Sequence, residues 1–173
     1  MGPNISMYAQ AQAMLHNLTT IANILNVIAI LMGLSLFLAG LFQFKKYGEA
    51  RSQMSSQHSI AGPLALITSG VFLLILPYTI TTALLAFFGP GQTMPLQYQG
   101  NTTQDIDVYI PVVLMFIRLI GVGAIIRALV LCSKLGSQGQ PGTLGKAMMH
   151  LLGGILCVHI LGTIQLVEFI FDL

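Results

Sequence analysis

Residues 21–46 read IANILNVIAILMGLSLFLAGLFQFKK, a run that carries no charge until its last two residues. About 20 apolar residues in a helix, at 1.5 Å per residue, are enough to cross the hydrocarbon of a bilayer. Three similar runs follow, so the predicted membrane-spanning helices are residues 21–44, 60–88, 108–132 and 147–171. The sequence therefore predicts an all-α membrane protein with four transmembrane helices.

The composition agrees with this prediction. With 55% hydrophobic and 7% charged residues, a soluble domain of 173 residues would lack polar surface. The net charge of +2 is small and divided between loops, so we expect no sequence-specific nucleic-acid binding. The N-terminus lacks the basic region and short apolar core of a secretory signal, so we expect no cleavage.

The distribution of lysine and arginine predicts the orientation. Basic residues gather in the predicted loops 45–59 and 133–146, namely Lys45, Lys46, Arg51, Lys134 and Lys146. Cytoplasmic loops collect such residues. Both loops are therefore expected in the cytoplasm, whereas the tail 1–20, the loop 89–107 and the C-terminus are expected outside. The result is two helical hairpins, 21–88 and 108–173, with extracytoplasmic termini. Lys45, Lys46 and Arg51 are also expected to contact anionic lipid headgroups.

Two local patterns refine this picture. Pro77 lies inside the second predicted span, where it removes one backbone hydrogen bond and should kink the helix. Residues 4–20 place apolar side chains on one helical face, which favours a helix on the outer surface or an extension of the first span. A frayed leader remains an equal alternative. The face consists of Met7, Ala11, Met14, Leu15 and Leu18.

The two hairpins carry matching landmarks, which suggests an internal duplication. Because both hairpins are expected to enter from outside, this would be a parallel repeat rather than an inverted one. The landmarks of the first hairpin are Gly33, Lys45, Gly48 and Gly70, and those of the second are Gly121, Lys134, Gly136 and Gly153. Small residues spaced four apart, such as Ala29/Gly33 and Ala124/Ala128, favour close helix packing, either within one chain or between subunits.

We expect no enzyme and no cofactor. The chain lacks a glycine-bracketed nucleophile, a phosphate-binding loop and a Cys-x-x-Cys pair. His150 and His159 are nine residues apart, on opposite faces of a helix, so they are not expected to share a metal. Cys132 and Cys157 are expected at different depths, too far apart for a disulfide.

Arg118 is the most informative charge, because it lies near the middle of the third predicted span. There an arginine costs on the order of 2.5–3.5 kcal/mol and needs a partner or water. His159 on the fourth span reaches a similar depth and Glu168 lies somewhat further out, so a cluster of Arg118, His159 and Glu168 is geometrically possible and is the candidate polar site. We interpret this cluster as a buried ionic interaction that links helices or subunits. The alternatives are a polar site that lines an aqueous path and snorkelling of the side chains toward the lipid headgroups. Arg127 is expected to be an anchor near the cytoplasmic face.

Three sequons on the expected outer side, at Asn4, Asn17 and Asn101, keep a eukaryotic tetraspan or junction protein as an alternative. The outer loop, however, lacks the cysteines that usually form disulfide bonds in the outer loops of such proteins.

The second hairpin contains a recognisable string of motifs. They are Arg118-Leu119-Ile120-Gly121, Ile126-Arg127, Ser133-Lys134-Leu135-Gly136, Gly139-Gln140-Pro141-Gly142-Thr143-Leu144-Gly145-Lys146, His150, Gly153-Gly154-Ile155-Leu156 and Gly162-Thr163, and the first hairpin adds Gly40-Leu41-Phe42-Gln43-Phe44-Lys45-Lys46 and Gly62-Pro63-Leu64. Together they resemble the IcmC/DotE group of inner-membrane proteins of Dot/Icm type IVB secretion systems and of related conjugative transfer systems.

The resemblance implies a multi-pass protein of the bacterial inner membrane that acts as a non-enzymatic structural subunit. Its partners would be lipids, other copies of itself and other membrane subunits of the apparatus. A pilin-like protomer is one alternative, and a small-solute channel or carrier using Arg118, His159 and Glu168 is another. In this light the loop motif, formed by Gln140, Pro141, Gly142, Thr143, Gly145 and Lys146, is expected to be a fixed cytoplasmic turn or, alternatively, a flexible connector.

Overall fold

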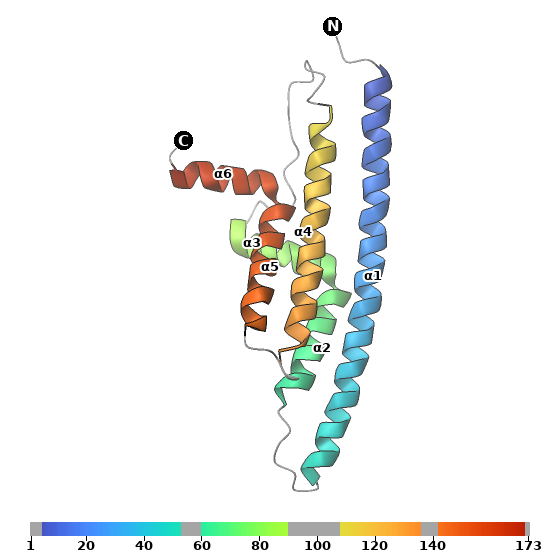
Figure 1. The fold of residues 1–173 in the computed structure, drawn as a ribbon, viewed down its shortest axis with the longest axis vertical. Coiled ribbons are helices and arrows are strands. Elements are labelled where there is room, and N and C mark those ends of the chain that lie inside the picture. Colours follow the sequence, from blue (N-terminus) through green and yellow to red (C-terminus); the bar gives the residue numbers. More distant parts are fainter. Residues whose placement is uncertain (1–4, 53–59, 90–107, 136–141, 172–173) are drawn as a thin grey trace. The chain divides into compact units, whose positions relative to one another are not determined.

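The computed structural model describes residues 5–52, 60–89, 108–135 and 142–171 (Figure 1). Within these ranges the regular structure is entirely helical, which confirms the predicted all-α class. The helices are α1 (Ile5–Ser52), α2 (Ala61–Leu74), α3 (Leu76–Phe88), α4 (Ile110–Ser133), α5 (Thr143–Val158) and α6 (Ile160–Phe171).

Helix α1 is much longer than the first predicted span. It has 48 residues, about 72 Å at 1.5 Å per residue, because no proline interrupts the chain between Pro3 and Pro63. It therefore continues through Lys45, Lys46 and Arg51, which were predicted to lie in a loop. Helix-compatible residues on both sides of the apolar run allow the helix to extend past the length that a bilayer requires.

The N-terminal segment extends the first span, as one of the predicted alternatives proposed. Ala11 on its apolar face is buried, whereas Met14 is about half exposed. The hydroxyl of Tyr109, just before α4, lies 3.5 Å from Oε1 of Gln10. Residues 5–20 are therefore a regular part of α1 rather than a frayed leader.

The second and fourth predicted spans are each divided into two helices. Helices α2 and α3 meet at Ile75 with a bend of 94°, and α5 and α6 meet at His159 with a bend of 98°. Helices α1 and α4 are long and apolar enough to cross a membrane, and the number of candidate spans rises to four if each bent pair counts as one. The described residues thus hold two to four candidate spans.

The chain divides into two compact units. One unit comprises Met1–Leu25, Ile80–Gly123 and Gly153–Leu173, and the other comprises Asn26–Thr79 and Ala124–Leu152. Each unit takes segments from both predicted hairpins, since α1 and α4 contribute to both. The two-hairpin topology therefore stays a prediction about the chain in the membrane.

Candidate functional site

Helices α1 and α2 touch backbone to backbone at a pair of glycines. A Cβ atom on Gly33 would lie 2.9 Å from the carbonyl oxygen of Gly70 and 2.9 Å from the nitrogen of Leu74. A Cβ atom on Gly70 would lie 2.7 Å from the nitrogen of Phe37. Side chains at these positions would force the helices apart, because backbone atoms cannot move aside as a flexible side chain can. Small residues are what allow such close approach between membrane helices.

Helices α4 and α5 repeat this contact. A Cβ atom on Gly121 would lie 2.8 Å from the carbonyl oxygen of Gly154 and 2.8 Å from the nitrogen of Val158. The contacted atoms stand in the same sequence relationship as in the first pair: the glycine oxygen and the nitrogen four residues later. We call the α1–α2–α3 and α4–α5–α6 segments the first and second repeats.

One predicted landmark of the repeat is corrected. The partner expected for Gly70 was Gly153, but its structural counterpart is Gly154. A Cβ atom on Gly153 would meet nothing within 4 Å. Gly153 and Gly154 are adjacent, so residue type alone could not show which of them contacts α4. A shift of one residue along a helix turns the position by about 100°, to a different face.

Each repeat then breaks at an equivalent place and closes the break with a threonine. The hydroxyl of Thr79 lies 3.0 Å from the carbonyl oxygen of Phe72 and 3.2 Å from that of Ile75. In the second repeat the hydroxyl of Thr163 lies 2.9 Å from the carbonyl oxygen of Leu156 and 3.0 Å from that of His159. The carbonyl oxygens of Ile75 and His159 also accept the backbone N–H of the same threonine, so the additional acceptor that each hydroxyl reaches across the break is the carbonyl oxygen of Phe72 or Leu156.

These threonines were missed by sequence reasoning, although a signal existed. Thr79 follows Gly70 by nine residues, and Thr163 follows Gly154 by nine residues. The predicted kink near Pro77 is confirmed at Ile75, because the proline cannot donate a backbone hydrogen bond and disfavours helical geometry in the residue before it. The second bend has no proline, so nothing in the hydrophobic pattern indicated it.

His159 is the side chain that distinguishes the second break. Its Nδ1 accepts a hydrogen bond of 3.1 Å from the backbone N–H of Gly162, three residues later, so the imidazole caps the first turn of α6. Its ring stacks on Phe88 with centroids 4.6 Å apart. A Cβ atom on Gly162 would collide with the imidazole, so the cap requires glycine there. The equivalent residue of the first repeat is Ile75, whose side chain cannot cap.

The ring orientation has a further consequence. Because Nδ1 accepts a hydrogen bond, the ring proton lies on Nε2. His159 is 1% exposed, and Nε2 has no hydrogen-bond partner in the described part of the chain. A buried donor without an acceptor is unfavourable by about 1–3 kcal/mol. The second break thus contains an unused polar group that the first break lacks.

The predicted cluster of Arg118, His159 and Glu168 is not formed through the histidine. Nδ1 of His159 accepts the N–H of Gly162, and its Nε2 has no hydrogen-bond partner among the described residues, so neither ring nitrogen bonds to Arg118 or Glu168. Glu168 is exposed on α6. Arg118 is partly buried on α4 and has an interaction of its own. The functional role of the three residues stays a prediction.

The predicted loop motif lies partly outside the described residues, which exclude Gln140 and Pro141. Gly142 has a positive φ of 96°, a left-handed conformation that favours glycine, and Thr143 begins α5. The N–H of Lys146 donates a 3.1 Å hydrogen bond to the carbonyl oxygen of Gly142. A Cβ atom on Gly145 would meet nothing within 4 Å. The described half of the motif is therefore a helix start.

The predicted lipid contacts lie at the C-terminal end of α1. Lys45 and Lys46 are exposed, and the ammonium of Lys45 lies 3.8 Å from a carboxylate oxygen of Glu49. The side chain of Arg51 lies outside the described residues. An exposed ion pair of this kind contributes little to stability, so Lys46 and Lys45 stay accessible to lipid headgroups.

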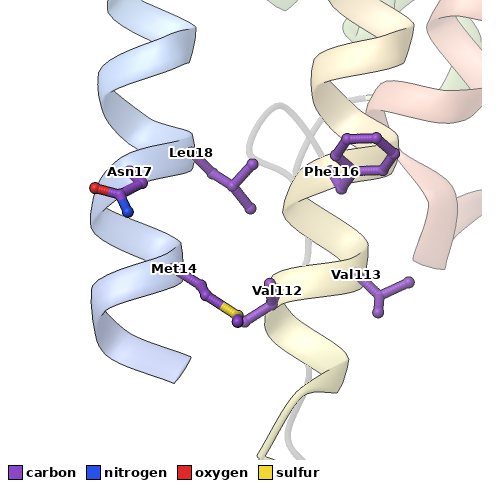
Figure 2. Close-up of a pocket in the computed structure, with 6 residues that line it drawn as sticks. All are labelled: Met14, Asn17, Leu18, Val112, Val113 and Phe116. Atoms are coloured by element: carbon purple, nitrogen blue, oxygen red, sulfur yellow. The ribbon is translucent and has the colours of Figure 1, made fainter. Parts of the chain in front are cut away.

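An apolar groove of about 390 Å³ lies between the N-terminal parts of α1 and α4. Met14 and Leu18 on α1 point toward Val112 on α4, and the amide of Asn17 points away from α4 (Figure 2). Val113 and Phe116 complete the lining. The groove presents no polar group suited to catalysis. Among the described residues, no three His, Cys, Asp or Glu side chains come together as a metal site.

Comparison with known proteins gives no match: no family model, no curated protein and no solved structure is similar to this chain.

Proposed function

We propose that this chain is a non-enzymatic structural subunit of a bacterial type IVB secretion or conjugation apparatus, inserted in the inner membrane and packed laterally against other subunits. The resemblance of its motifs to the IcmC/DotE group supports the assignment to such an apparatus. The two to four candidate membrane-spanning helices support its location in a membrane.

The observation that carries lateral packing is the surface of α6. Its residues from Ile164 to its last residue, Phe171, are all exposed, and the side chain of Phe169 is 87% exposed. Within its own compact unit, α6 therefore has a largely uncovered apolar surface. In a bilayer such a helix can face lipid, but close packing with another helix gains additional dispersion contacts.

The test is mass spectrometry of the intact full chain after extraction from its native membrane in mild detergent. The proposal expects species heavier than the 18.6 kDa monomer and co-purifying membrane proteins. A strictly monomeric chain without partners would contradict it. In a variant with both native cysteines replaced by alanine, Gly139→Cys should react with an impermeant thiol reagent only after the cells are opened. Labelling of intact cells would overturn the proposed topology.

A second candidate function is a small-solute channel or carrier that uses Arg118, His159 and Glu168. The buried Nε2 of His159 at a helix break favours it, because polar groups at such breaks often serve transport. Solute flux into liposomes that contain this protein alone distinguishes the two functions. A carrier gives solute flux that His159→Leu abolishes, whereas the structural subunit gives no flux.

A further inference from the structure

The two bends of the chain are held by different means. In the first repeat Pro77 has no backbone N–H, and its ring would clash with the carbonyl of Leu73 in a regular helix. Helices α2 and α3 therefore cannot join into one continuous helix. In the second repeat every residue from 156 to 163 has a backbone N–H. The 98° bend between α5 and α6 therefore depends on side chains rather than on a proline.

The side chain that holds the second bend is His159. In a continuous helix the N–H of Gly162 would donate to the carbonyl oxygen of Val158, four residues earlier. In the bent form this N–H donates instead to Nδ1 of His159, at 3.1 Å. The imidazole thus competes with the backbone for one donor. The bend is stabilised for as long as Nδ1 is an acceptor.

Protonation of the imidazole removes this acceptor. An imidazolium carries a proton on both nitrogens, so Nδ1–H would face the N–H of Gly162, donor against donor. The ring of His159 is also 1% exposed, and neither of its nitrogens bonds to a carboxylate among the described residues. A buried charge without a counter-ion is strongly unfavourable. The charged ring is therefore expected to leave its place and release Gly162.

The helices around His159 offer no group that would hold a charged ring. Helix α3 contributes the ring of Phe88 and has no charged residue. Helix α4 carries Arg118, and a cation disfavours a second one nearby. Next to the break, α5 carries the neutral thiol of Cys157, and on α6 the carboxylate of Glu168 is exposed. The other titratable groups of these four helices are Tyr78, Arg127, Cys132, Lys146 and His150.

We infer that His159 is a pH-sensitive switch for the position of α6. The neutral imidazole holds α6 nearly at a right angle to α5, and uptake of one proton frees α6 to swing toward a continuous helix with α5. Histidine suits this role because its charge ordinarily changes between about pH 5 and pH 8. Pro77 excludes the same change at the first bend, so the second repeat alone carries the switch.

The change decides whether this segment crosses the hydrocarbon. Helix α5 alone has 16 residues, about 24 Å, which is shorter than the ~30 Å layer. A continuous helix over residues 143–171 would measure about 43 Å, and α5 and α6 together are apolar enough to form a span. The inference goes beyond the proposed structural role and is independent of it, because it depends on the bend and its cap alone.

The experiment measures the distance across the second bend in the full-length chain, reconstituted in lipid nanodiscs, with Cys132 and Cys157 replaced by alanine. Spin labels are attached at Met149→Cys and Phe169→Cys, positions that are 72% and 87% exposed. At 1.5 Å per residue, their backbones are about 21 Å apart in the bent form and about 30 Å apart in a straight helix. We expect double electron–electron resonance to give the short distance at about pH 8 and a population that reaches the long distance at about pH 5.

The first bend is the matched control. Labels at Leu64→Cys and Leu85→Cys, positions that are 50% and 43% exposed, lie about 22 Å apart when bent. This distance should stay the same at both pH values because Pro77 fixes the break. In the labelled second bend, His159→Asn supplies an uncharged capping oxygen and should keep the short distance at both pH values. His159→Leu has no acceptor and should show the long-distance population at both.

Each outcome decides the inference. A short distance at both pH values in the parent chain overturns the switch. A pH-dependent increase that persists in His159→Asn assigns the proton to another group and overturns the role of His159. An equal change at the first bend would mean a general loss of structure in acid, and this comparison needs no variant at position 159. None of these measurements depends on oligomers, so intact mass spectrometry tests the proposed function separately.

Discussion

Gly121 and Gly154 meet backbone to backbone, and Gly33 has the same relationship to Gly70. Four glycines thus fix the spacing of the helix pairs in both repeats. Each pair is followed by a break, a bend of nearly a right angle and a threonine whose hydroxyl reaches back across the break to a carbonyl seven residues earlier. The likeness of the two segments lies in this order of contacts more than in residue identity, and a duplication of the chain stays a prediction.

Replacing Gly121 by valine should destabilise the protein. The added side chain would lie too close to the backbone of α5, and overpacking of this kind costs about 1–3 kcal/mol. Thermal unfolding in detergent, followed by circular dichroism, measures the effect. Gly123→Val is the matched control, since a Cβ atom there meets nothing within 4 Å, and its stability should change by less than about 0.5 kcal/mol. Equal effects of the two variants would contradict the close contact.

Thr163→Val should loosen the second bend while preserving the volume of the side chain. It leaves the carbonyl oxygens of Leu156 and His159 without their hydroxyl donor, a loss of about 0.6–2 kcal/mol among membrane helices. Thr20→Val is the control, because the hydroxyl of Thr20 binds the His16 oxygen within an unbroken helix. Thermal unfolding of the two variants gives the comparison, and a control as destabilised as Thr163→Val would argue against a special role at the break.

His159→Ala should uncap α6. The N–H of Gly162 loses its acceptor, and loss of a cap typically costs about 0.5–2 kcal/mol. Hydrogen exchange by mass spectrometry should show faster exchange in peptides that cover the start of α6 and little change in α1. His159→Asn retains a capping oxygen and should restore part of the protection. Slow exchange in both variants would show that the imidazole does not hold this turn.

The helical class and the candidate membrane spans followed from the sequence, because uncharged runs of sufficient length have few other structures open to them. The bend near Pro77 followed as well, since proline acts locally. The bend at His159 did not, because it depends on a cap formed by an imidazole with Gly162 in three dimensions. The length of α1 was also underestimated, as hydropathy marks where lipid ends rather than where a helix ends.

The predicted polar cluster shows the limit of arguments from depth. Counting residues placed Arg118 and His159 at similar depths and Glu168 somewhat further out, but depth along a helix does not determine the direction of a side chain. The imidazole turns toward Gly162 and Phe88 instead. The repeat was recognised from Gly33, Gly70 and Gly121 because close helix contacts admit almost no other residue.

Helix α1 is a single rod about 72 Å long, more than twice the ~30 Å thickness of the hydrocarbon layer. It has no proline at which it could hinge. A helix of this length that crosses the layer leaves roughly 40 Å of its axis outside the hydrocarbon, where its exposed lysines, Lys45 and Lys46, can reach headgroups and water.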